Sequence, residues 1–180
     1  MSVFRFLIPA VILFILSNTV FSQSYAIKGQ FWVSGLTSNN VPSDQSSLET
    51  NIGYTPTLSL LRELDNNRLL DMELSYRLDR MYLGDSLINN NENFHRLWIR
   101  YSSDKLEARL GLQKIVFGPS QVLRSLSWFD TIDLKDPTGQ TNGVEAFRLR
   151  WFSSNSLSLW SWAINNDQDT LSYGVRGELS

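Results

Sequence analysis

The chain has 180 residues, a formal net charge of −2 and no cysteine. Its length has room for one domain, and the balanced charge argues against a nucleic-acid partner. The lack of cysteine excludes a disulfide framework and thiol chemistry. Aromatic residues make up 12% of the chain, with six tryptophans, and tryptophan and tyrosine favour the interface between a membrane and water.

An apolar segment near the N-terminus predicts export. Arg5 precedes an uncharged apolar run over residues 6–16, and a small-residue site ends at Ser22. This order of features is typical of a secretory signal peptide. We therefore expect residues 1–22 to be removed and the mature chain to begin at Gln23. The alternative, an uncleaved anchor helix, requires a longer apolar run.

The rest of the chain alternates between apolar and polar residues. Over residues 70–79, for example, each apolar side chain is followed by a polar one. A period of two residues indicates a strand with one apolar face and one polar face. Turn-forming residues divide this pattern into eight expected strands, at residues 25–35, 49–61, 69–82, 94–101, 106–117, 144–152, 157–164 and 170–179.

Long strands with densely charged polar faces predict an antiparallel transmembrane β-barrel. Strands of about ten residues cross a tilted bilayer, with lipid on the apolar face and water on the other. The expected connections alternate in length, with long loops at residues 37–47, 84–93 and 118–142. Outer-membrane barrels have short periplasmic turns and long external loops. The fold class is therefore all-β, with a barrel over residues 23–180 in the bacterial outer membrane. A secreted soluble β-protein would leave the alternating loop lengths unexplained.

One stretch of the chain supports a family. Gly111-Leu112-Gln113 in the fifth strand, Phe117-Gly118 at its end and Asp136-Pro137 in the next loop resemble porin-type outer-membrane barrels of Bacteroidota and related phyla. They are also distantly similar to alginate-export and phosphate-selective porins. In general porins the third external loop folds back into the barrel. By this resemblance we expect residues 118–142 to fold inward.

The end of the chain departs from that family. Complete barrels of this type usually close with a strand that ends in an aromatic residue, whereas this chain ends at Leu179-Ser180. The interior of an eight-stranded barrel is filled by side chains, which leaves no space for an inward loop. We therefore expect the eight strands to be the N-terminal part of a larger barrel. A complete eight-stranded barrel is the alternative.

Charged residues on the expected inner faces predict the pore lining and the constriction. Rings of opposed charge select ions in pores. The alternative is that acids of the third strand simply neutralise neighbouring arginines across the ladder. Trp128 and Phe129 are expected to hold the long loop against the wall. The expected pore-lining residues are Arg96, Arg100, Arg109, Arg124, Asp130, Asp133, Asp136, Arg148 and Arg150.

The sequence argues against an enzyme, a cofactor and a metal site. His95 is the single histidine, and neither a Gly-x-Ser-x-Gly elbow nor a His-x-x-x-His pair occurs. We interpret His95 as an interfacial ring. The acids of the long loop offer oxygens that calcium prefers, but the EF-hand pattern is absent, so no metal is predicted.

These observations favour an outer-membrane channel for passive or weakly selective passage of small polar or anionic solutes. The alternative is a structural or anchoring barrel with a filled lumen and no transport activity. The expected partners are outer-membrane lipid and a small polar solute. The sequence leaves association into a homo-oligomer open.

Overall fold

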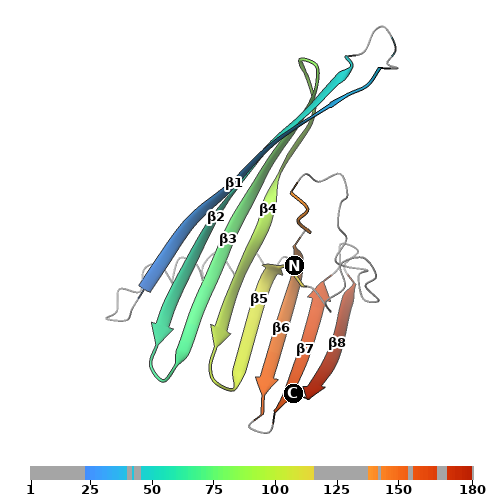
Figure 1. The fold of residues 1–180 in the computed structure, drawn as a ribbon. Coiled ribbons are helices and arrows are strands. Elements are labelled where there is room, and N and C mark those ends of the chain that lie inside the picture. Colours follow the sequence, from blue (N-terminus) through green and yellow to red (C-terminus); the bar gives the residue numbers. More distant parts are fainter. Residues whose placement is uncertain are drawn as a thin grey trace.

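The computed structural model describes residues 23–39, 42, 46–115, 138–141, 143–153, 156–165 and 170–179. This part of the chain is all-β and folds into one sheet (Figure 1). Its strands follow one another in the order β1 to β8, and each pairs antiparallel with the next. Their bounds are β1 Gln23–Thr37, β2 Leu48–Leu64, β3 Arg68–Leu83, β4 Ser86–Ser102, β5 Leu106–Gln113, β6 Val144–Phe152, β7 Leu157–Asn165 and β8 Leu171–Leu179.

The eight expected antiparallel strands are thus confirmed, whereas closure of the sheet into a barrel is not seen. In the described residues, β1 and β8 form the two edges of the sheet and do not pair with each other. The expected signal peptide lies outside the described residues, as does most of the long loop. The same applies to the loop residues Arg124, Trp128, Phe129, Asp130, Asp133 and Asp136. No helix in the described part is long and apolar enough to cross a membrane.

The first four strands are about twice as long as the last four. β1 to β4 have 15 to 17 residues and β5 to β8 have 8 or 9. Figure 1 shows the upper ends of β1 to β4 extending well beyond the other strands. The extra length comes partly from residues 84–93, because the expectation of a long loop there is wrong.

The β3–β4 connection is a tight turn at Gly84 and Asp85, and β4 begins at Ser86. Gly84 has a φ of 58°, a conformation that glycine adopts without steric cost. Asparagine is depleted in strands, which is why the Asn-rich stretch predicts a loop. Pairing with β3 overrides that preference: Asn90 lies opposite Arg80, and its Oδ1 accepts a hydrogen bond from Arg80 Nε. The strict alternation of loop lengths therefore fails at this connection.

A tight turn at residues 65–67 connects two of the expected strands. Asn66 and Asn67 have φ angles of 61° and 55° and join β2 to β3. Asparagine tolerates this left-handed conformation better than most residues. The turn fixes the register in which Leu58 faces Leu74 and Leu60 faces Met72. A shift of this pairing register by one residue would move the apolar side chains of the strand to the opposite face of the sheet.

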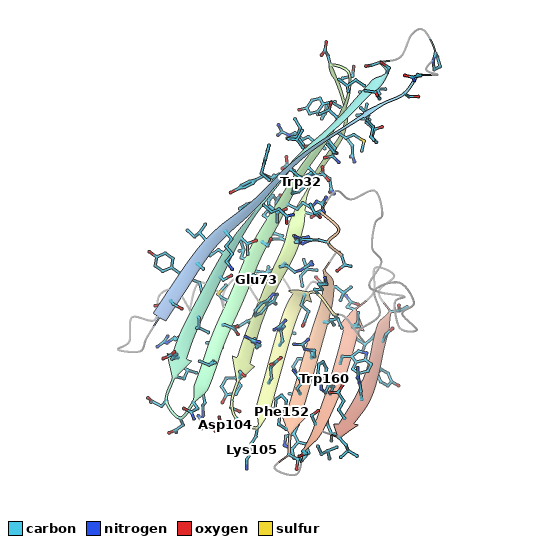
Figure 2. The ribbon with its side chains drawn as sticks, viewed as in Figure 1. Trp32, Glu73, Asp104, Lys105, Phe152 and Trp160 are labelled. Carbon is cyan, nitrogen blue, oxygen red and sulfur yellow. The ribbon has the colours of Figure 1, made fainter. Side chains whose placement is uncertain are left out.

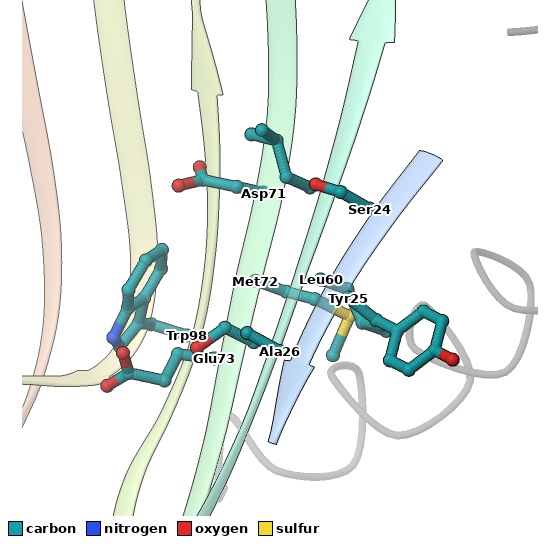
Figure 3. Close-up of a pocket in the computed structure, with 10 residues that line it drawn as sticks. Ser24, Tyr25, Ala26, Leu60, Asp71, Met72, Glu73 and Trp98 are labelled. Atoms are coloured by element: carbon teal, nitrogen blue, oxygen red, sulfur yellow. The ribbon is translucent and has the colours of Figure 1, made fainter. Parts of the chain in front are cut away.

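The register gathers most apolar side chains on one face and most charged side chains on the other, although Ala146 and Ile164 of the charged face are buried together in a small apolar cluster. At the centre of the apolar face, Leu60 and Met72 are buried among Leu58, Leu70 and Ile99. Farther out, large apolar residues of this face are exposed, among them Tyr25, Ile27, Phe31, Leu110, Phe147, Trp151, Tyr173 and Val175. Figure 3 shows the same division locally, with Asp71 and Glu73 on one side of the sheet and Met72 and Tyr25 on the other.

Candidate functional site

The polar face carries a dense set of charged and aromatic side chains, which we call the polar wall. It consists of Lys28, Gln30, Thr57, Asp71, Glu73, Ser75, Arg96, Trp98, Arg100, Glu107, Arg109, Arg148, Arg150 and Trp160. They share a face because side chains two residues apart along a strand point the same way. Antiparallel pairing then aligns these positions from strand to strand.

Ion pairs cross the strands in the lower half of the wall. Arg100 Nε and Nη2 donate to the two carboxylate oxygens of Asp71 at 2.8 and 2.6 Å, a bidentate geometry. Arg148 Nη2 donates to Glu107 Oε1 at 2.8 Å, and Arg100 lies 3.8 Å from the same carboxylate. The structure therefore brings Arg100 and Arg148 together through Glu107. Alternation of Leu106, Glu107 and Ala108 placed Glu107 on the polar face, but the sequence did not single it out.

Asp71 confirms the alternative in which acids of the third strand neutralise arginines across the ladder. Glu73 does not follow it, because its cross-strand neighbours are Ser59 and Trp98. Asp79 pairs within its own strand, with Arg77 at 3.0 Å. The acids of the long loop lie outside the described residues, so their expected place in the pore lining stays a prediction.

Two arginines of the polar wall, Arg109 and Arg150, stack on tryptophan, and no ion pair with a carboxylate is seen for them among the described residues. The guanidinium of Arg109 lies 4.2 Å from the ring centroid of Trp98, and that of Arg150 lies 3.7 Å from Trp160. These distances are within the range of cation–π attraction. The Nε atoms of Arg109 and Arg150 are buried without a hydrogen-bond partner. The rings hold these side chains in place but leave their hydrogen-bonding capacity incompletely used.

Glycines on facing strands make room for tryptophans of the polar face. A Cβ atom added to Gly53 would lie 2.0 Å from the ring of Trp32, and one added to Gly174 would lie 2.3 Å from Trp162. Both pairs are direct cross-strand neighbours. The indoles therefore lie over the backbone of the next strand. Alternation along one strand does not reveal this pairing, because it depends on the register between strands.

The returning end of the long loop lies on the polar face. Gln140 bonds to His95 at 2.7 Å and donates a hydrogen bond to Gln30 Oε1, which links β4 to β1. Arg96 donates to the carbonyl oxygens of Thr141 and His95 at 2.7 and 2.6 Å. The few loop residues that are described thus lie against the polar face of the sheet, and the inward fold of the loop stays a prediction.

Two expectations from the sequence change here. His95 is only 5% exposed and bonds to the loop, so its interpretation as an interfacial ring is wrong. Arg96 is 7% exposed and its guanidinium binds backbone carbonyls. It therefore anchors the loop end to the sheet and presents little of its charge to the wall surface. A β-bulge at this point of β4, between two pairing registers, brings both side chains to the same side.

Two cavities open on the polar wall. The larger, about 310 Å³, is lined by Lys28, Gly29, Gln30, Thr55, Thr57, Glu73, Ser75, His95, Arg96 and Gln140. The smaller, about 220 Å³, lies below it and includes Asp71, Glu73 and Trp98 among its lining residues (Figure 3). Glu73 borders both cavities, near the middle of the sheet (Figure 2).

No family model matches the chain, and no match was found among curated proteins or solved structures.

Proposed function

We propose that this chain forms part of the wall of an outer-membrane β-barrel through which small polar or anionic solutes pass along the polar wall. One observation carries the proposal: charged side chains are more sheltered than their apolar neighbours. On β6, the side chain of Arg148 is 14% exposed, whereas the adjacent Phe147 is 42% exposed. Charged residues of water-soluble proteins are mostly exposed and large apolar residues are mostly buried.

A lipid environment accounts for this inversion. Phe147 and its cross-strand neighbour Leu110 belong to interior strands, so their exposure does not come from a sheet edge. An apolar surface that continues over several strands is larger than soluble monomers usually expose. Lipid would cover it, while the sheet satisfies its own backbone hydrogen bonds. In the bilayer, the free edges of β1 and β8 would have to pair with further strands, because unpaired edges are not tolerated there.

The apolar face becomes polar where β3 and β4 extend beyond the other strands. Tyr76 and Phe94 meet edge to face, with ring centroids 5.2 Å apart. Beyond them, the same face carries Arg80, Asn90 and Glu92, which bond to one another. Aromatic rings mark the membrane interfaces of outer-membrane barrels. We place the upper interface at the Tyr76–Phe94 pair, so that the ends of β3 and β4 stand in water.

The charge of the wall favours anions. Arginines outnumber carboxylates in its lower half, which contains Arg100, Arg109, Arg148 and Arg150 with Asp71 and Glu107. An excess of arginine in a pore attracts anions. The positive excess comes from Arg109 and Arg150, which stack on tryptophan.

Planar-bilayer conductance of the folded full-length chain tests the proposal. We expect stepwise currents with a reversal potential that indicates a preference for anions. A chain that folds into lipid bilayers but passes no current would contradict the channel. That result would instead support a filled-lumen structural barrel, which the ion pairs across the wall also allow. Recovery in a soluble fraction would contradict both.

A further inference from the structure

We infer that the larger cavity of the polar wall binds a small zwitterionic solute, such as an amino acid or a dipeptide. The ammonium group of this solute faces Glu73 and its carboxylate faces Lys28. The inference deepens the proposed function, on which it rests for the arrival of the solute from the lumen. Binding itself does not require transport, so the two can be tested separately.

The cavity has a size suited to such a molecule. Its volume of about 310 Å³ corresponds to roughly ten waters at their share of liquid volume. Strands β1 to β4 form its walls, and Gln140 from the returning loop closes one side. Gln140 is fixed by its bonds to His95 and Gln30. The cavity is therefore a shaped part of the wall that the loop helps to define.

Opposite charges line the cavity without neutralising each other. Lys28 projects from β1 and Glu73 from β3, and in the described part of the chain neither forms an ion pair. β2 lies between them, so their backbones are roughly 10 Å apart at the usual strand spacing. A molecule with a positive and a negative end fits between such groups. Each of its charged ends would then meet a side chain of opposite sign.

The remaining lining is neutral and can form hydrogen bonds. The hydroxyls of Thr57 and Ser75 bond to each other at 3.0 Å across β2 and β3. In the register Thr57 lies opposite Lys28 and Ser75 lies opposite Thr57, while Glu73 is two residues from Ser75 along β3. The two hydroxyls thus line the cavity beside both charged side chains and offer donors and acceptors to a solute. Arg96 also borders the cavity, but its donors already bind the carbonyls of His95 and Thr141. Lys28 is thus the cationic side chain of the cavity that can bind the carboxylate of a solute.

The lower half of the wall differs from this cavity. There, arginines exceed acids, whereas the cavity presents one available cation and one carboxylate. The lower half therefore attracts anions in general, and the cavity selects molecules that carry both charges. Glu73 lies beside Trp98 at the border between these two regions (Figure 3).

Calorimetric titration of the folded full-length chain in detergent tests the site, with glycylglycine as the zwitterionic probe and glycerol as the neutral comparison. We expect glycylglycine to bind and glycerol not to bind. Glu73→Gln and Lys28→Gln should each weaken binding about tenfold, the effect of losing one charge-assisted hydrogen bond. Lys105→Gln removes a charge at the distant β5 turn (Figure 2) and should leave binding unchanged.

A charge exchange separates dipolar recognition from local packing. The double variant Lys28→Glu/Glu73→Lys keeps both charges but reverses their positions, so glycylglycine should bind in the opposite orientation with affinity within a few-fold of the wild type. The inference is overturned if glycylglycine binds no better than glycerol, if either single variant binds like the wild type, or if the double variant binds as weakly as the single ones. Binding without conductance would contradict the channel and leave the site intact.

Discussion

Replacement of Glu107 by glutamine tests the charge network of the polar wall. The Glu107 carboxylate accepts a hydrogen bond from Arg148 at 2.8 Å and lies 3.8 Å from Arg100. It also faces Arg150 across the β5–β6 ladder. Glutamine keeps the shape of the side chain but removes the charge. Arg100 would keep its pair with Asp71, whereas Arg148 and Arg150 would lose the carboxylate that they face on β5.

The expected cost follows from burial and distance. At an effective dielectric constant of about 20, unit charges 4 Å apart interact by about 4 kcal/mol, and in water by about 1 kcal/mol. The side chain of Glu107 is 12% exposed, so its environment lies between these limits. The glutamine oxygen still accepts one hydrogen bond from Arg148. We therefore expect Glu107→Gln to lower the free energy of unfolding by about 1–3 kcal/mol.

Urea unfolding of the chain in detergent, followed by tryptophan fluorescence, measures this difference. The matched control is Glu178→Gln, which removes the acid of the Arg176–Glu178 pair on β8. Because that pair is much more exposed, its loss should change the stability by less than about 1 kcal/mol. In a double-mutant cycle, Glu107 and Arg148 should show a coupling energy of about 1–2 kcal/mol. Equal effects of the two glutamine variants would refute the network.

Three further predictions concern packing, lipid contact and selectivity. Gly174→Val should destabilise the sheet by about 1–3 kcal/mol in urea unfolding, because its Cβ would collide with Trp162, whereas Gly177→Val meets an ordinary 3.5 Å contact and should be nearly neutral. Val175→Arg should reduce the favourable free energy of folding into lipid by about 2–4 kcal/mol, the cost of an arginine near the bilayer midplane, although Val175 is 73% exposed and loses few contacts. Ser172→Arg on the polar face is the control. Equal losses of folding free energy for the two variants in vesicle-folding titrations would contradict the assigned lipid face. Arg109→Gln should shift the reversal potential towards cations; an unchanged value would mean that Arg109 does not contact permeating ions.

The sequence predicted the strands well because alternation reports directly which side chains share a face. The bounds of β6 were predicted to the residue, and those of most other strands to within a few residues. The main failure was the Asn-rich stretch of β4. Local propensity favours a loop there, but pairing with β3 extends the hairpin. Such pairing depends on residues that lie on another strand, so a single stretch of sequence does not reveal it.

The sequence predicted which arginines of the candidate site share a face, but it did not predict which side chains they contact. Alternation placed Arg100, Arg109, Arg148 and Arg150 on one face, where the structure has them. Their partners depend on register. Arg100 bonds to Asp71 directly across the ladder, and Arg148 bonds to Glu107 on the diagonal. The charge pattern of one strand does not contain that information. The role of Arg96 required the position of the loop end, which comes from a part of the chain far away in sequence.

Arg96 provides the sharpest test of whether the long loop narrows the pore. It is 7% exposed, and its two hydrogen bonds tie Thr141 to β4 beside His95. Arg96→Gln shortens the side chain and removes its charged donors, so the loop end should be released from the sheet. If the loop forms the constriction, Arg96→Gln should raise single-channel conductance and its noise, and deletion of residues 122–138 should raise conductance further. Arg80→Gln is the control, because Arg80 lies on the opposite face near the end of β3. Unchanged conductance and ion selectivity in the deletion variant would show that the loop does not line the narrowest part of the pore. In that case Arg96 would serve only to close the upper cavity of the wall.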